Sequence, residues 1–177
     1  EDVASFLAVN PQIGLFHFDM TYRPVPLSQT FIGVSEKNRF KSKVLMAEIA
    51  YNKAKALVLQ GHQVMVFVHS RKETGSTAKE FLKMAQDEGR TNLFCGLQPA
   101  TDGSNLLMGA GYDPMEGGFI PSWALQEIQR CRASELKQIV PLGVGIHHAG
   151  MFRSDRKLVE RLFSEGVLRV LMCTSTL

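Results

Sequence analysis

The sequence of 177 residues lacks most of the short motifs by which enzymes are recognised. It contains no GxxxxGK[ST] phosphate loop, no acidic box for Mg²⁺ and no GxSxG nucleophile turn. Gly143 and Gly145 resemble the start of a dinucleotide-binding fingerprint, but His148 occupies the place of its third glycine. The sequence therefore predicts no complete ATPase, hydrolase or dinucleotide site.

Cysteines, long apolar runs and strong charge are also scarce. Cys95, Cys131 and Cys173 show no CxxC spacing, which excludes a zinc ribbon and a disulfide framework and indicates a reducing compartment. No apolar run approaches the roughly 18 residues of a membrane span, and no signal peptide is visible, so no membrane partner is expected. The net charge of +3 is too small to indicate nucleic acid by itself.

What the sequence does contain is a regular alternation of apolar strands and amphipathic helices. Continuous apolar runs predict buried strands, and 3.6-residue spacing predicts helices. Strands are expected over 63–68, 139–146 and 168–173, and helices over 35–60, 74–88 and 154–164. This order predicts an α/β fold of the RecA-like type, with a parallel sheet covered by helices on both faces.

The chain is expected to have two parts and one insertion. Residues 1–34 read as an arm with short strands at 14–18 and 29–34, and residues 35–177 as one domain that begins with Ser35 as helix N-cap. Residues 91–121 hold six glycines and three prolines and no Lys or Arg, which predicts an inserted surface loop. Because the chain starts without Met and stops just after an apolar strand, a segment of a longer protein is expected.

Polar residues follow each of the three expected strands, and ligands of parallel sheets bind at the carboxyl ends of strands. After the first strand, the Ser70 hydroxyl and the planar Arg71 guanidinium suit a phosphate. In the alternative reading, Ser70 only caps the next helix and Arg71 is solvated. After the last strand, Thr174 either binds phosphate or caps the following helix.

The middle strand ends in His147-His148-Ala149-Gly150. Adjacent residues of a strand point to opposite faces, so the two histidines are not expected to chelate one metal. One is expected to be buried and hydrogen-bonded, while the other faces a ligand. Gly150 permits close approach of a backbone N–H to an anion. Asp155 is expected on a solvated helix face, where the helix dipole favours it.

Three motifs occur together and in order, and each follows a predicted strand. Val66-Phe67-Val68-His69-Ser70-Arg71 resembles helicase motif IV, Ile146-His147-His148-Ala149-Gly150-Met151 resembles motif IVa, and Val170–Leu177 resembles the start of motif V. Jointly they resemble the second RecA-like domain of the Ski-like DExH helicases. Segments of residues 1–34 resemble the large two-cassette branch, in its first cassette, and only residues 91–121 match nothing.

The resemblance implies an ATP-dependent 3′-to-5′ helicase. The family positions matching Ser70, Arg71, His148, Gly150 and Thr174 lie along the path of a single nucleic-acid strand. The implied cofactors, ATP and Mg²⁺, would be held mainly by the preceding RecA-like domain, and no catalytic or metal-binding residue is expected in this chain. Further implied partners are that preceding domain and a multi-subunit complex, in the nucleus and cytosol.

Two rival functions stay open at this point. The chain could be a module that binds nucleic acid or a protein without turnover, which the presence of a Walker A lysine elsewhere in the protein would argue against. It could also be an unrelated doubly wound enzyme that acts on a small phosphorylated metabolite. Strong salt dependence of single-strand binding would argue against that second rival.

Overall fold

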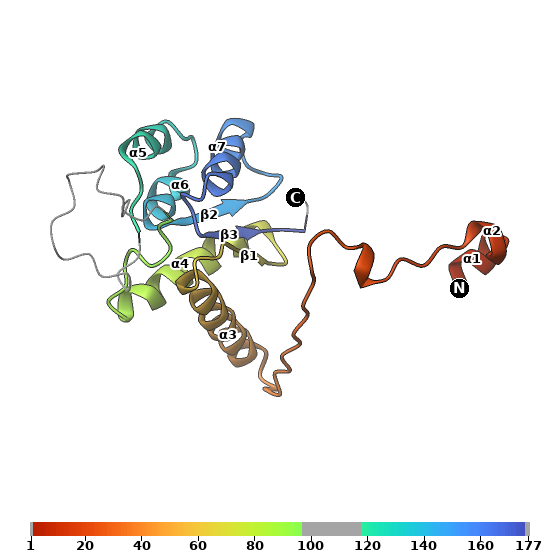
Figure 1. Cartoon of the computed structure of the whole chain (residues 1–177). Coiled ribbons are helices and arrows are strands. Elements are labelled where there is room, and N and C mark those ends of the chain that lie inside the picture. Colours follow the sequence, from red (N-terminus) through yellow and green to blue (C-terminus); the bar gives the residue numbers. More distant parts are fainter. Residues whose placement is uncertain (1, 97–117, 176–177) are drawn as a thin grey trace. The chain divides into compact units, whose positions relative to one another are not determined.

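The structure is a computed structural model that describes residues 2–96 and 118–175 (Figure 1). The chain divides into two units, Glu1–Val34 and Ser35–Leu177, and each is described by itself. The first unit contains two short helices, α1 (Asp2–Phe6) and α2 (Pro11–Gly14), and the 3₁₀ turn η1 (Met20–Tyr22). Asn10 caps α2, because its side chain accepts a hydrogen bond from the Gln12 N–H at 3.0 Å.

The strands expected at 14–18 and 29–34 are not formed. The structure assigns helix end and irregular backbone to the first segment and irregular backbone to the second. A strand needs a hydrogen-bonding neighbour, and among the described residues no backbone hydrogen bond joins either segment to another strand. Alternating apolar residues such as Phe16 and Phe18 therefore stay exposed, at 71% and 68%.

The second unit is built on a three-stranded parallel sheet in the order β1-β3-β2. The strands are β1 (Val64–Phe67), β2 (Val144–His147) and β3 (Val170–Cys173). In the last row of the register, Cys173 pairs with Phe67 on one side and with His147 on the other. The parallel sheet with its helices confirms the expected α/β class.

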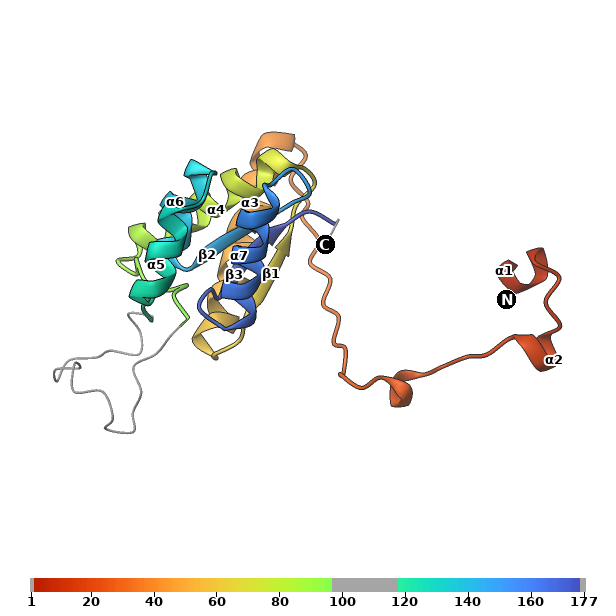
Figure 2. The same cartoon turned by 90° about the horizontal axis from the view of Figure 1, so that it is seen from above.

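Helices lie on both faces of this sheet. They are α3 (Arg39–Leu59), α4 (Arg71–Asp87), α5 (Ser122–Gln129), α6 (Ser134–Ile139) and α7 (Arg153–Ser164). In Figure 2, α7 lies on one face, and α3 and α4 lie on the other. A Cβ added at Gly145 would come within 2.9 Å of Val159 on α7, so this glycine lets α7 pack closely on β2.

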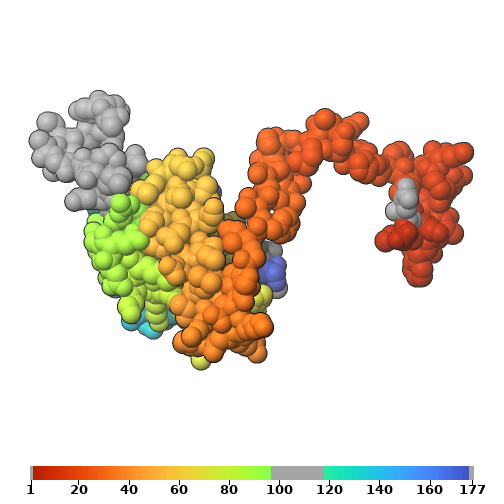
Figure 3. Space-filling model, turned by 90° about the horizontal axis from the view of Figure 1, so that it is seen from below, coloured from red at the N-terminus to blue at the C-terminus, as the bar shows by residue number. Residues whose placement is uncertain are grey.

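Helix α3 packs on the domain through its second half only. Tyr51, Ala54 and Val58 are buried, and the Tyr51 ring meets those of Phe81 and Phe94 edge-on. The first half extends beyond the sheet in Figure 1, and the orange to yellow surface of α3 is open to view in Figure 3. In this half, Phe40 is 77% exposed. The expected cap Ser35 was wrong.

The true cap of α3 is Asn38, whose Oδ1 accepts hydrogen bonds from the N–H groups of Phe40 and Lys41 at 3.0 and 3.1 Å. An Asx side chain in this place satisfies two of the N–H groups that the first helical turn leaves open. The helix ends as expected before Gly61, which has a φ of 86°.

Strand β2 is shorter than the apolar run that predicted it. Residue 139 ends α6, and η3 (Val140–Leu142) follows before the strand starts at Val144. The turn depends on Gly143, which has a φ of 84° and lies so close to Phe94 that an added Cβ would be 2.0 Å from its carbonyl carbon. Apolar content alone could not separate this buried turn from a strand.

Strand β1 is buried on one face only, whereas two-sided burial was expected. Met65 is 40% and Phe67 60% exposed, because α7 packs mainly on β2, at the other edge of the sheet. Residues 97–117, most of the expected loop 91–121, lie outside the described residues. Within the described part of the chain, no helix has the length and apolar character to cross a bilayer.

Candidate nucleic-acid interface

The carboxyl ends of the parallel strands bring three of the five candidate residues into contact. Arg71 starts α4 just after β1, and His148 and Gly150 follow β2. A Cβ placed on Gly150 would lie 3.0 Å from Arg71 Nη1 and 3.3 Å from His148 Nδ1. The guanidinium, the imidazole and the bare backbone of the glycine therefore form one continuous surface.

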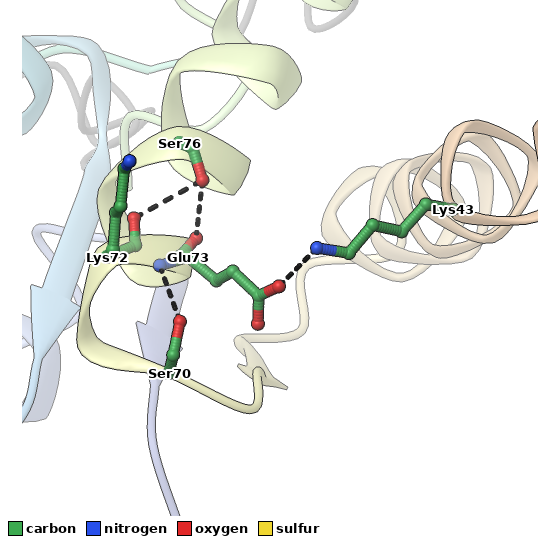
Figure 4. Close-up of polar contacts among 5 residues, drawn as sticks. All are labelled: Lys43, Ser70, Lys72, Glu73 and Ser76. Carbon is green, nitrogen blue, oxygen red and sulfur yellow. Dashed lines mark hydrogen bonds and ion pairs between the residues drawn. The ribbon is translucent and has the colours of Figure 1, made fainter. Parts of the chain in front are cut away.

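Ser70 sets the start of α4. Its Oγ accepts a hydrogen bond from the Glu73 N–H at 3.3 Å, which makes Ser70 the N-cap of the helix (Figure 4). The capping interpretation of Ser70 is therefore correct, and the helix begins three residues earlier than expected, at Arg71. This geometry places Arg71 in the first turn, at the edge of the sheet.

Arg71 has no carboxylate partner among the described residues, although two carboxylates lie near it in the fold. Glu73 forms an ion pair with Lys43 of α3, drawn in Figure 4, and this lysine holds the pKa of Glu73 below its ordinary value. Glu135 pairs with Lys79 at 2.9 Å. Because lysines engage both acids, the Arg71 charge is left for an anion.

His148 is held in one orientation by its own loop. Its Nδ1 accepts a hydrogen bond from the Gly150 N–H at 3.1 Å, so in the neutral ring the proton sits on Nε2. Burial, and then the positive Arg71, keep the pKa of His148 below its ordinary value of 6.5. The neutral ring therefore presents an N–H donor beside Arg71 at physiological pH.

We expect Arg71→Ala to raise the pKa of His148, because it removes the second-largest cause of the lowered value. The measurement is an NMR titration of the His148 ring protons. In the unsubstituted protein the midpoint of His148 should lie below the ordinary histidine pKa of 6.5. A His148 midpoint that Arg71→Ala leaves unchanged would contradict the contact between the two side chains.

His147 behaves as the other member of the histidine pair. It is 4% exposed, and its Nε2 lies 2.7 Å from Glu160 Oε1 on α7, while its Nδ1 has no partner among the described residues. The expectation of one buried, hydrogen-bonded histidine is confirmed, and a ligand contact of the other histidine, His148, stays a prediction. The partner Glu160 was missed, because thirteen residues separate it from His147 in sequence.

Thr174 lies directly beyond β3 and beside the end of β2. It is half-buried, and its N–H donates to the His147 carbonyl oxygen at 3.3 Å. The last hydroxyl residue of the expected motif, Thr176, lies outside the described residues, as does Leu177. Because β3 is the central strand, Thr174 lies between the ends of β1 and β2.

The expectation of a solvated Asp155 was wrong. This carboxylate is 2% exposed, and its Oδ2 accepts hydrogen bonds from the N–H groups of Arg132 and Ala133 at 3.0 and 2.9 Å. Oδ1 accepts from the Ser154 hydroxyl at 3.1 Å. Ala133, the N-cap residue of α6, supplies no side-chain cap, and Asp155 of α7 instead fixes the two backbone N–H groups that directly precede the helix.

The described residues offer no converging set of His, Cys, Asp and Glu side chains for a metal ion. Cys95, Cys131 and Cys173 are buried and free, and burial raises the pKa of the Cys95 thiol to about 12. Unreactive thiols of this kind fill core space rather than act as nucleophiles.

Comparison with known proteins points to one group of helicases, although no family model matches the chain. The chain is 43% identical over 176 residues to activating signal cointegrator 1 complex subunit 3 of Danio rerio. It is 43% identical over 175 residues to a DExH-box ATP-dependent RNA helicase of Arabidopsis thaliana, and 41% over 177 residues to the RQC trigger complex helicase of Saccharomyces cerevisiae. Each alignment covers 99% of this chain but only 7–10% of the relative.

Proposed function

Because this chain is homologous to a segment of the Ski-like DExH-box helicases, we propose that it is the second RecA-like domain of an ATP-dependent helicase that moves 3′ to 5′ along a nucleic-acid strand. The Arabidopsis thaliana relative is named as an ATP-dependent RNA helicase, and the matched segment makes up 7% of its length. Activity is therefore a property of the intact protein, and this chain alone hydrolyses nothing.

The role proposed for this domain is to hold the phosphate backbone of the strand. The observation that carries the proposal is the contact of Arg71, His148 and Gly150 at the carboxyl edge, with no carboxylate neutralising Arg71 among the described residues. A guanidinium and an imidazole N–H donate to phosphate oxygens without reading bases. Ser70, directly before Arg71, and Thr174, directly after β3, lie at the same carboxyl edge of the sheet and would contact the bound nucleic-acid strand as well.

ATP and Mg²⁺ would be held mainly outside this chain, with the domain supplying one face of the ATP cleft. The acidic ligands that Mg²⁺ requires are not brought together among the described residues. When bound, ATP supplies the free energy of closing two RecA-like domains on the strand. What this chain's own residues do in that cycle is bind and release phosphates at the Arg71 edge.

The proposed partners follow from the same homology. Residues 1–34 would connect to a preceding RecA-like domain. Two relatives are named as members of complexes, one of a cointegrator complex and the other of an RQC trigger complex. We propose that this protein also works within a multi-subunit complex, in the nucleus and cytosol, in DNA repair or ribosome quality control.

The test is ATP hydrolysis by the intact protein with and without a single strand, together with unwinding of duplexes that carry either a 3′ or a 5′ tail. We expect stimulation by the strand and unwinding of the 3′-tailed duplex only. RNA and DNA versions of each substrate identify the track. Unwinding from the 5′ tail would overturn the proposed direction.

The alternative is a binding module without turnover. It is supported by the fact that the phosphate-facing residues, but no nucleotide motif, lie in this chain. Salt-dependent strand binding by an intact protein that shows no ATP hydrolysis would establish the module and exclude the motor.

A further inference from the structure

A second arginine, Arg132, lies near the Gly150 loop, because it contacts the ring of Phe152. The Arg132 Cζ lies 5.1 Å from the centroid of the Phe152 ring. Phe152 is the N-cap residue of α7, two positions after Gly150, and it is 52% exposed. Arg132 is exposed as well and lies in the short connection between α5 and α6.

The position of this arginine is fixed by its backbone. The Asp155 Oδ2 accepts the N–H groups of both Arg132 and Ala133, so the connection is tied to the first turn of α7. Both Asp155 oxygens are occupied by these bonds and by Ser154. The carboxylate therefore holds the Arg132 backbone and does not neutralise its guanidinium.

A second arginine–aromatic pair, which involves Arg161 of α7, differs from the Arg132 pair in the charge that surrounds the guanidinium. The Arg161 Cζ lies 5.2 Å from the Trp123 ring centroid, but this guanidinium also forms ion pairs with Glu127 and Glu165. The positive charge of Arg161 is therefore paired with carboxylates of the protein itself, in the last turn of α7 and far from the Gly150 loop. Among the described residues, Arg132 has no such carboxylate.

We propose that Arg132, held over the Phe152 ring, donates to a second backbone phosphate of the bound single strand. The inference rests on the proposed function and extends its surface from Arg71, across Gly150, to the α5–α6 connection. A guanidinium stacked on an aromatic ring keeps its N–H edge open for the two oxygens of a phosphate. The ring reduces the rotamer freedom that binding would otherwise remove.

The first test is strand binding by intact Arg132→Gln, measured by fluorescence anisotropy over a range of salt concentrations. The slope of log K against log salt is negative, and losing one phosphate contact should make it less steep by about 0.7. Binding should weaken by about fivefold near 0.15 M salt. Arg132→Lys keeps the charge but loses the planar edge, so its slope should stay while its affinity falls.

The matched control is Arg130→Gln. Arg130 is also exposed, and its substitution removes the same charge two residues away from Arg132. Among the described residues, however, no aromatic ring contacts the Arg130 guanidinium. Phe152→Leu tests the ring without changing charge, and we expect a loss of about twofold that disappears when combined with Arg132→Gln. Circular dichroism confirms that each variant is folded.

The outcomes separate the inference from the function on which it rests. If Arg71→Ala weakens binding but Arg132→Gln matches Arg130→Gln, the second phosphate contact is wrong and the proposed function stands. If neither Arg71→Ala nor Arg132→Gln changes the affinity or the salt slope, both proposals fail. An additive loss in Phe152→Leu with Arg132→Gln would overturn the role of the ring.

Discussion

Arg71→Ala is expected to weaken single-strand binding by the intact protein about thirtyfold, since a charge-assisted hydrogen bond to a phosphate contributes about 2 kcal/mol. Nucleic-acid-stimulated ATP hydrolysis should fall with it, while hydrolysis without a strand should not change. The reason lies in the charge balance of the sheet edge, where lysines engage both Glu73 and Glu135. The measurement combines anisotropy titration with an ATPase assay at saturating and subsaturating strand.

Two variants define what Arg71 contributes. Arg71→Lys keeps a positive charge but not the planar fork, so it should recover part of the affinity. Lys83→Ala removes an exposed charge from a later turn of the same helix and should leave binding unchanged. If Lys83→Ala weakens binding as much as Arg71→Ala does, the effect is one of net charge and the site is misplaced.

Gly150 allows the arginine's effect to be separated from that of the bare backbone. Gly150 has no positive φ, so Gly150→Ala causes no backbone strain, and its Cβ would press on the Arg71 side chain. If the methyl group acts by displacing Arg71, its effect on binding should vanish in the Arg71→Ala background. If it blocks the strand directly, the loss should persist in that background.

The elements that the sequence predicted well are those whose signals are local. The apolar runs placed β1 and β3 within about two residues, as expected where strands are bounded by glycine and polar residues. The His147-His148 pair was interpreted correctly from strand alternation alone, since one side chain is buried and the other reaches the edge. The same kind of pattern wrongly predicted a strand over residues 29–34. A strand forms only beside a hydrogen-bonding neighbour, and a local sequence does not show whether that neighbour exists.

The parts that could not be predicted depend on contacts between distant segments. Glu160 meets His147 only when α7 packs on β2, and Asp155 meets Arg132 only when the α5–α6 connection folds back on α7. Arg132 has no motif around it, and its neighbour Phe152 reads as an ordinary residue before a helix. The residues at the strand ends therefore indicated Arg71 as one alternative, and the family resemblance implied it, but neither pointed to Arg132.

Asp155→Ala is expected to lower the free energy of unfolding by about 3 kcal/mol, because it leaves two backbone N–H groups without their charged acceptor and creates a gap beneath them. Those N–H groups belong to Arg132 and Ala133, at the start of α6. The most direct measurement is hydrogen exchange, in which these two amides and the first turn of α6 should exchange faster. Urea unfolding gives the total loss of stability.

The conservative variants divide this loss into shape and charge. Asp155→Asn keeps one oxygen that can accept both N–H groups, so it should cost about 1 kcal/mol, whereas Ser154→Ala removes only the hydroxyl contact and should cost less. Faster exchange confined to α7 in Asp155→Ala, with Arg132 and Ala133 still protected, would contradict the role of Asp155 in holding the backbone before α6. Exchange that spreads into the α5–α6 connection, with weaker strand binding, would tie the buried carboxylate to the placement of Arg132.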